Sequence, residues 1–190
     1  MKILIFDTET TGFPSPTQRI VQFASSMCKF TPRGESYYIS HFMTLVKSDV
    51  APHEKAEEVH GISKSMADNG IDEKKLALYF KRQVENADYL AAHNIKFDLQ
   101  FMNMLFARLD IEPPEYPPMI CTMDQTTHLC KILNTKGAGY KWPKLVEACK
   151  ILLDFDIEGA HDALVDTQAC AMLVDYLVKH KYVILAPRSV

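Results

Sequence analysis

The sequence has no apolar run that approaches the roughly 20 residues of a membrane-spanning helix. Its N-terminal apolar run covers only residues 3–6 and leads straight into acidic residues, with no small-residue cleavage site after it. That pattern does not fit a signal peptide. Both absences predict a cytoplasmic protein that is not attached to a membrane.

The chain also has no excess of positive charge. Lysine and arginine number 21 against 24 acidic residues, for a net charge of −3 at pH 7. A protein that holds nucleic acid by charge alone is usually basic. If this protein binds nucleic acid, the attraction must therefore be local or carried by metal ions.

The cysteines form no C-x-x-C pair. They are odd in number and widely spaced, which argues against a disulfide framework or a zinc site and favours buried, reduced thiols. The five cysteines are Cys28, Cys121, Cys130, Cys149 and Cys170.

No internal repeat or low-complexity segment divides the chain, and residues 1–190 are expected to form a single α/β domain. Its first part predicts three strands in an antiparallel meander, and residues 53–70 a loop with a short helix. From Ile71 onward helical periodicity alternates with short apolar runs, which indicates a mixed sheet covered by helices on both faces. The expected strands are 3–7, 20–30, 37–47, 88–94 and 119–123, and the expected helices are 72–87, 97–110, 142–153 and 161–180.

Two acids stand at the end of the first expected strand, in the stretch FDTETTG at 6–12. Because side chains alternate along a strand, Asp7 and Glu9 continue the apolar row of Ile3 and Ile5. Charged carboxylates at a buried strand end cost several kcal/mol unless something compensates them. The alternative is that the strand has already ended and both acids are solvated.

Two further acids lie in register with apolar helix faces. In the expected helix 97–110, counting back three or four positions from the first apolar residues reaches Asp98, and in 161–180 the same count reaches Asp166. A cap at the first helical turn is the other explanation for Asp98. Four inward acids with no lysine or arginine on the same faces need cations, and oxygen ligands suit Mg²⁺ or Mn²⁺. The pattern therefore predicts a pair of metal ions.

His161 precedes Asp166 in a segment that reads as a loop ending at a helix start, with Asp162 as its N-cap. This places His161 above the expected site, although a surface histidine is the alternative. His60 and His93 precede turn-like residues near the site. The other histidines, His41, His53, His128 and His180, are expected to be structural or exposed.

Three stretches, FDTETTG (6–12), AHNIKFD (92–98) and HDALVDT (161–167), resemble the three motifs of the DEDDh 3′–5′ exonuclease family. VHGI at 59–62 is a further feature of that family. The family includes the proofreading epsilon subunit of bacterial replicative polymerase, exonuclease X, ribonuclease T and oligoribonuclease. The resemblance implies a ribonuclease H-like fold and a phosphodiesterase that uses two metal ions and releases nucleoside 5′-monophosphates.

The resemblance also implies a role for particular residues. The four acids would be catalytic and would bind two Mg²⁺ (or Mn²⁺) ions, and His161 would be the general base. Bases would stack on Phe13 and Ile62. The residues expected to contact substrate are Thr8, Thr11, Phe13, His60, Ile62 and Asn94.

We expect the substrate to be single-stranded or frayed DNA rather than RNA, with RNA as the open alternative. A polymerase or replication protein is a candidate partner, and the oligomeric state is left open. Two rival classes are a catalytically silent binding module of the same fold and an adaptor with surface acids. Several lysines could contact phosphates, although a solvated surface role is favoured for each: Lys96, Lys136, Lys141 and Lys144.

Overall fold

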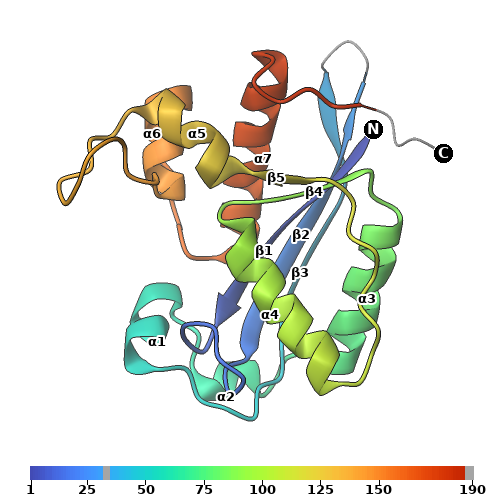
Figure 1. Cartoon of the computed structure of the whole chain (residues 1–190). Coiled ribbons are helices and arrows are strands. Elements are labelled where there is room, and N and C mark those ends of the chain that lie inside the picture. Colours follow the sequence, from blue (N-terminus) through green and yellow to red (C-terminus); the bar gives the residue numbers. More distant parts are fainter. Residues whose placement is uncertain (32–34, 187–190) are drawn as a thin grey trace.

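The computed structural model describes residues 1–31 and 35–186. A five-stranded sheet forms its centre, with strand order β3-β2-β1-β4-β5 (Figure 1). The first three strands pair antiparallel, whereas β4 and β5 run parallel to β1. This confirms the predicted mixed sheet. The strands are β1 (Lys2–Thr10), β2 (Ile20–Phe30), β3 (Ser36–Leu45), β4 (Tyr89–Ala92) and β5 (Met119–Cys121).

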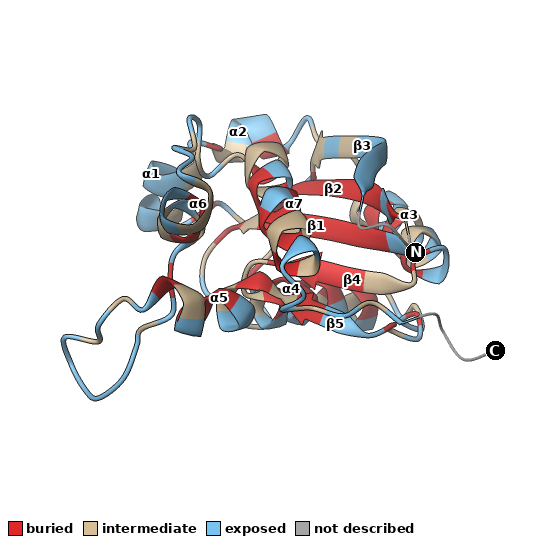
Figure 2. Cartoon of the chain, turned by 90° about the horizontal axis from the view of Figure 1, so that it is seen from above, coloured by how far each residue is buried: buried red, intermediate tan, exposed pale blue. Residues whose placement is uncertain are grey.

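Helices cover both faces of the sheet, as expected. Helices α3 and α4 pack on one face and α7 on the other, with the inner strands buried between them (Figure 2). The helices are α1 (Glu54–His60), α2 (Lys64–Ala67), α3 (Glu73–Glu85), α4 (Ile95–Arg108), α5 (Thr122–Cys130), α6 (Leu145–Leu153) and α7 (Ala163–Lys179).

Strand β1 alternates between the two layers. Leu4 and Phe6 pack with α3 and α4, whereas Ile3 and Ile5 pack with α7. The alternation follows from the two-residue period of a strand. Every side chain at the end of β1 is thereby directed toward one helix layer or the other.

The first strand is longer than the sequence indicated. It pairs with β2 as far as Thr10, which lies opposite Ile20 after an irregularity between Glu9 and Thr10. The alternative in which the strand ends before the acids is therefore wrong. The ladder to β2 holds the backbone of Asp7 and Glu9 in the sheet.

Other boundaries differ for local reasons. Strand β5 ends at Cys121 rather than at residue 123, because its partner β4 ends at Ala92 and offers no further pairing. Helix α4 begins two residues earlier than expected, since Asn94 adopts a left-handed φ of 70° and turns the chain directly into the helix. The segment 53–70 contains two short helices, α1 and α2, in place of one.

The expected N-cap of α3 is confirmed. Asp72 caps α3 by accepting a hydrogen bond from the backbone N–H of Lys74 (2.8 Å). All five cysteines are free thiols, and four of them are buried. None of the helices in the described ranges is long and apolar enough to cross a membrane.

Candidate active site

The four acids predicted from the sequence come together at the carboxyl end of β1. Asp7 and Glu9 belong to β1, Asp98 to the first turn of α4 and Asp166 to the first turn of α7. Their mutual influence is direct, since the other three acids each raise the pKa of Asp7. Elements from both helix layers therefore converge on one strand end.

Asp98 is held by the strand itself. It is 2% exposed, and its Oδ1 accepts hydrogen bonds from the backbone N–H (3.0 Å) and the hydroxyl (2.7 Å) of Thr8. These donors explain how a carboxyl survives burial. The N-capping alternative does not describe Asp98, because the N-cap of α4 is Asn94, and Asp98 lies on the buried face with Phe101 and Met102.

Asp166 is satisfied on one oxygen only. Its Oδ2 accepts from the backbone N–H of His161 (3.1 Å), whereas its buried Oδ1 has no hydrogen-bond partner among the residues that the structure describes. Glu9, His161 and Asp166 each offer one atom that could bind a metal ion, and these three atoms lie within 4.8 Å of one another. His161 is thus brought to the acids, as predicted, from a loop position with a left-handed φ of 73°.

Burial raises the pKa of all four acids, and repulsion by neighbouring acids adds to the shift at Asp7, Glu9 and Asp166. Burial is the largest cause in each case, and it raises the pKa of Glu9 to about 8 and that of Asp98 to about 7. The hydrogen bonds from Thr8 oppose the shift at Asp98. The pKa of Asp7 is raised well above its ordinary value, and that of Asp166 is also raised, although His161 opposes the shift there.

The arrangement fits divalent cations. It offers several carboxylate oxygens in a small space, and one of them, Asp166 Oδ1, is buried and lacks a hydrogen-bond partner within 1–31 and 35–186. Among the residues that the structure describes, none of the four acids forms an ion pair with a lysine or arginine. Hard cations prefer such oxygen ligands, and they would relieve the repulsion that raises these pKa values.

One element of the site was missed by the sequence analysis. Asp162 caps α7 as expected, accepting from the backbone N–H of Leu164 (3.0 Å), but it also accepts from the side chain of Gln22 (3.2 Å). The Gln22 oxygen in turn accepts from the backbone N–H of Ala163 (2.9 Å). Gln22 lies opposite Glu9 in the β1–β2 ladder and so ties the start of α7 to the acid strand. The signal in the sequence for this role was Gln22 itself, an amide side chain within the apolar-rich run 20–30.

A cavity of about 650 Å³ opens beside Glu9. Phe13 projects at its rim, with 89% of its surface exposed. Helix α1 and the start of α4 form the remaining walls. The lining includes Gly12, Phe13, Val59, His60 and Phe97.

The remaining predicted contact residues divide into two groups. His60 lines the cavity, and its ring bridges the carbonyl of Thr10 (3.2 Å) and the backbone N–H of Ile62 (3.0 Å). Ile62 is only 4% exposed and packs against Val21 and Ala67. The structure therefore contradicts the prediction that a base stacks on the Ile62 side chain.

Thr8 and Thr11 are buried, so neither presents its side chain as an open surface. The Thr11 hydroxyl donates to Gln18 Oε1 (2.5 Å). The His93 ring forms hydrogen bonds with the Thr122 hydroxyl (3.0 Å) and the Pro143 carbonyl (3.0 Å), and so joins two other segments. Burial lowers the pKa of His93.

The fold and the site together define a class of protein. A mixed sheet with helices on both faces carries four inward carboxyls and a histidine at one strand end, beside an open cavity. That combination is typical of hydrolases that use carboxylate-bound cations.

Comparison with known proteins identifies the family. The family model described as an exonuclease (RNase_T) matches residues 4–174. The chain therefore belongs to the DEDD-type 3′–5′ exonuclease family, a family of enzymes that act on nucleic acids.

Two relatives illustrate its breadth. The chain is 26% identical over 176 residues to a PolC-type DNA polymerase III of Mycoplasma genitalium, covering 93% of this chain but 11% of the polymerase. It is 26% identical over 197 residues to ribonuclease T of Shewanella denitrificans, covering 92% of this chain and 79% of that protein.

Solved structures show the same fold. Exonuclease I of E. coli in complex with a dT13 oligonucleotide superimposes with a TM-score of 0.76 at 18% identity, over 93% of this chain and 40% of that one. A zinc-bound complex of the same enzyme with single-stranded DNA gives 0.78 at 17% identity, over 95% and 41%. The chain thus spans less than half of exonuclease I.

Proposed function

We propose that this protein is a metal-dependent exonuclease that removes nucleoside 5′-monophosphates from the 3′ end of single-stranded or frayed DNA. The observation that carries the proposal is the convergence of Asp7, Glu9, Asp98 and Asp166, each with a raised pKa, on one strand end. Family membership supports the reaction class.

The four acids would hold two divalent cations, Mg²⁺ or Mn²⁺, which when bound activate water and stabilise the leaving oxygen of a phosphodiester. Thr8 keeps Asp98 turned toward this position through its two hydrogen bonds. Gln22 and Asp162 keep the first turn of α7 in place, so that Asp166 remains at the same strand end.

His161 is the proposed general base. His161 is exposed, so its ring can pass a proton to solvent. A ring nitrogen lies within 4.8 Å of a carboxylate oxygen of Glu9 and of Asp166. An imidazole suits the transfer of a proton near neutral pH. The role proposed for His161 is proton acceptance from the attacking water rather than metal binding.

The cavity beside Glu9 is the proposed site of the terminal nucleotide. Phe13 offers an exposed ring on which a base can stack, and Val59, His60 and Phe97 complete the wall. Asn94 and the backbone near Thr11 are proposed to approach the same nucleotide. A base that stacks on the Phe13 ring must first leave its pairing partner, so the last base must be unpaired.

DNA is favoured over RNA in this proposal. Structural relatives were solved with oligodeoxynucleotides, and the PolC relative is a DNA polymerase. Ribonuclease T relatives keep RNA end processing as the second candidate. A polymerase is proposed as a partner on the PolC match alone, and a cytoplasmic location on the five free thiols, which reducing compartments favour.

The test uses two end-labelled single strands of equal sequence, one DNA and one RNA, each with and without Mg²⁺. Stepwise shortening of the DNA from its 3′ end, only with Mg²⁺, is expected. Faster shortening of the RNA would contradict the preference for DNA and indicate an exoribonuclease. If neither strand is shortened in Mg²⁺ or Mn²⁺, the proposal fails and the alternative of a catalytically silent binding module of this fold is favoured.

A further inference from the structure

The segment between α5 and α6, residues 131–144, is a hairpin that extends from the body of the molecule, and we call it the arm (Figures 1 and 2). Leu133 and Tyr140 face each other in an isolated antiparallel bridge. The backbone N–H of Asn134 donates to the carbonyl of Gly139 (3.0 Å), whose φ of 83° permits the turn. The arm is therefore an ordered projection.

The composition of the arm is opposite to that of the active site. Its sequence, KILNTKGAGYKWPK, has four lysines and no acid in a chain whose net charge is −3. Apolar groups are exposed between these lysines: Leu133 is 72% and Trp142 67% exposed. Exposed large apolar side chains within a charged hairpin indicate a binding surface.

Most of the lysine charge is free to meet a partner. Lys141 pairs with Glu147 of α6 (2.6 Å). Lys131, Lys136 and Lys144 form no ion pair with any residue in 1–31 or 35–186. The positive charge of the arm is thus left for a negative partner.

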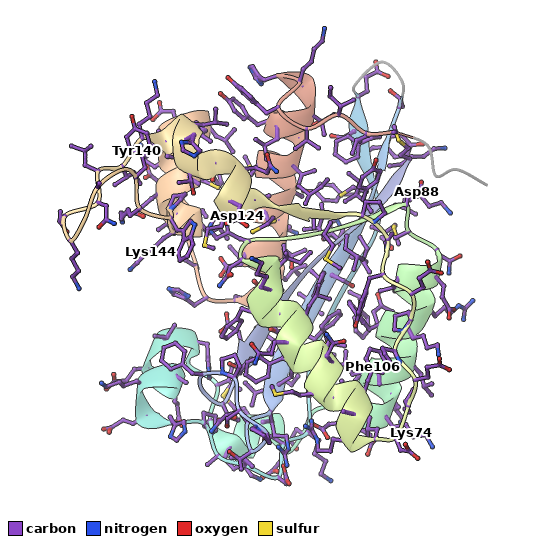
Figure 3. All side chains as sticks on the ribbon, viewed as in Figure 1. Lys74, Asp88, Phe106, Asp124, Tyr140 and Lys144 are labelled. Atoms are coloured by element: carbon purple, nitrogen blue, oxygen red, sulfur yellow. The ribbon has the colours of Figure 1, made fainter. Side chains whose placement is uncertain are left out.

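The base of the arm is fastened beside the active site. The Pro143 carbonyl contacts the His93 ring (3.0 Å), and His93 directly precedes Asn94, the N-cap of the helix that carries Asp98. Tyr140 packs edge-on against the His128 ring of α5 at 6.0 Å between centroids. Figure 3 shows Tyr140 and Lys144 together on the α5–α6 side of the molecule.

We propose that the arm binds the nucleic-acid strand behind its terminal nucleotide, with a base stacked on Trp142 and phosphates near Lys136 and Lys144. The proposal rests on the proposed function, since it takes the strand entering the active site as the ligand. Lysines that follow a backbone, together with aromatic rings that accept any base, are the two components of sequence-independent single-strand binding. The absence of acids in the arm favours this ligand over a protein surface of mixed charge.

Trp142 is the only tryptophan of the chain, so its fluorescence reports on the arm alone. We would titrate the Asp166→Asn protein in Mg²⁺ with a 20-nucleotide oligothymidylate and with thymidine 5′-monophosphate. The 20-mer is expected to quench the fluorescence saturably, whereas the mononucleotide, which fills only the terminal site, should not. Quenching by neither ligand, when the 20-mer binds by filter retention, would overturn the proposal.

Salt dependence separates the lysines from the tryptophan. Lys136→Ala with Lys144→Ala should make the log–log slope of affinity against salt shallower by about 1.4, from about 0.7 per phosphate contact on single strands. The matched control is Lys74→Ala with Lys75→Ala on the exposed side of α3, which should leave the slope unchanged. An equal change in both double variants would show only an effect of net charge and contradict the proposal.

Kinetics distinguishes failure of the arm from failure of the proposed function. Trp142→Ala should raise KM about tenfold or more for the 20-mer but not for a dinucleotide, and Trp142→Phe should restore most of the loss. An equal rise in KM for both substrates would overturn the proposal that the arm binds the strand. If the unaltered protein cleaves neither substrate, the proposed function fails. Quenching of Trp142 fluorescence by the 20-mer would still support strand binding by the arm. Fluorescence that changes with protein concentration alone would show a contact between copies instead.

Discussion

The active site and the arm are two charged regions that the fold treats in opposite ways. Asp98 is 2% exposed and held by two hydrogen bonds from Thr8, whereas Trp142 is 67% exposed. Chemistry on a phosphodiester requires groups held in place to a fraction of an ångström, and buried elements provide this. Binding a flexible strand, the role proposed for the arm, requires charge and a stacking surface, and a projecting hairpin with exposed lysines and Trp142 offers both.

The electrostatic difference follows from solvent access. Burial raises the pKa values of the four acids, whereas Lys131, Lys136 and Lys144 of the arm are exposed to water, where each charge costs little. The proposed metal site therefore needs cations to offset this repulsion, whereas the arm needs no such compensation. Substitutions at the two regions should consequently differ in the kind of loss as well as in its size.

The largest effect is expected at the acids. Asp166→Asn should lower the cleavage rate at least about 10³-fold, because the contribution of a bound cation is worth several kcal/mol and each 1.4 kcal/mol is about tenfold in rate. Asp175→Asn, on the same helix but paired with Lys179, is the matched control and should keep the rate. Retention of more than about a tenth of the rate by Asp166→Asn would contradict the two-metal proposal.

His161→Ala should lower the rate by about 10²–10⁴-fold, the usual span for loss of a general base. Mg²⁺ affinity, measured by calorimetry, should change little because the four carboxyls remain. Since the His161 backbone N–H, which contacts Asp166, is kept in this variant, the loss should report on the imidazole. A parallel loss of metal binding would make His161 a ligand rather than a base.

Removal of the cations should make the stability of the protein depend on pH. Acids whose pKa is raised in the folded state, such as Glu9 (about 8) and Asp98 (about 7), stabilise the fold when protonated, and this contribution is lost as pH rises through those values. In EDTA the free energy of unfolding should fall by about 1–3 kcal/mol between pH 5 and 9, a range discounted for solvent around Glu9.

Urea denaturation monitored by circular dichroism would measure this dependence, and Mg²⁺ should flatten it. Asp166→Asn should also raise the unfolding midpoint in EDTA, because it removes one of four mutually repelling charges. A midpoint that does not vary with pH in EDTA would mean that the acids are compensated by something other than cations.

The smallest effect concerns the state of the 3′ end. A mismatched terminus should be cut faster than a matched one, since unpairing costs a few kcal/mol for a matched pair and less for a mismatch. The difference should narrow as temperature rises and matched ends fray. Equal rates at low temperature on duplexes that differ only in the last pair would show that the cavity accepts a paired base.

Local periodicity allowed much of the site to be predicted. The strand period placed Asp7 and Glu9 on the row of Ile3 and Ile5, and the helical period placed Asp98 at the head of a buried face. These inferences succeeded because the direction of a side chain within one element depends on residues only a few positions away. The N-cap of α7 at Asp162 was predicted from another local signal, the preference of Asp for N-cap positions.

Other features depended on contacts that no local pattern records. Ile62 was expected to meet a base, but it packs against Val21 and Ala67. Strand β5 stops at Cys121, where β4 also ends and helix α5 begins, although the sequence pattern extended the strand to residue 123. Exposure of a particular side chain depends on which distant segment covers it, and the sequence near that side chain does not specify this.

The sequence by itself determined which chemical groups this protein offers: four carboxyls, two on one strand and two on separate helices as local periodicity indicates, and a histidine in a loop. Only the tertiary structure decided that these elements meet at one strand end and that Thr8 holds Asp98 across 90 positions. It also decided that Gln22 holds the start of α7 through Asp162, 140 positions away. The physical reason is range: side-chain direction is a local property of the backbone, whereas hydrogen bonds between layers and the burial that shifts a pKa arise only when the whole sheet is assembled.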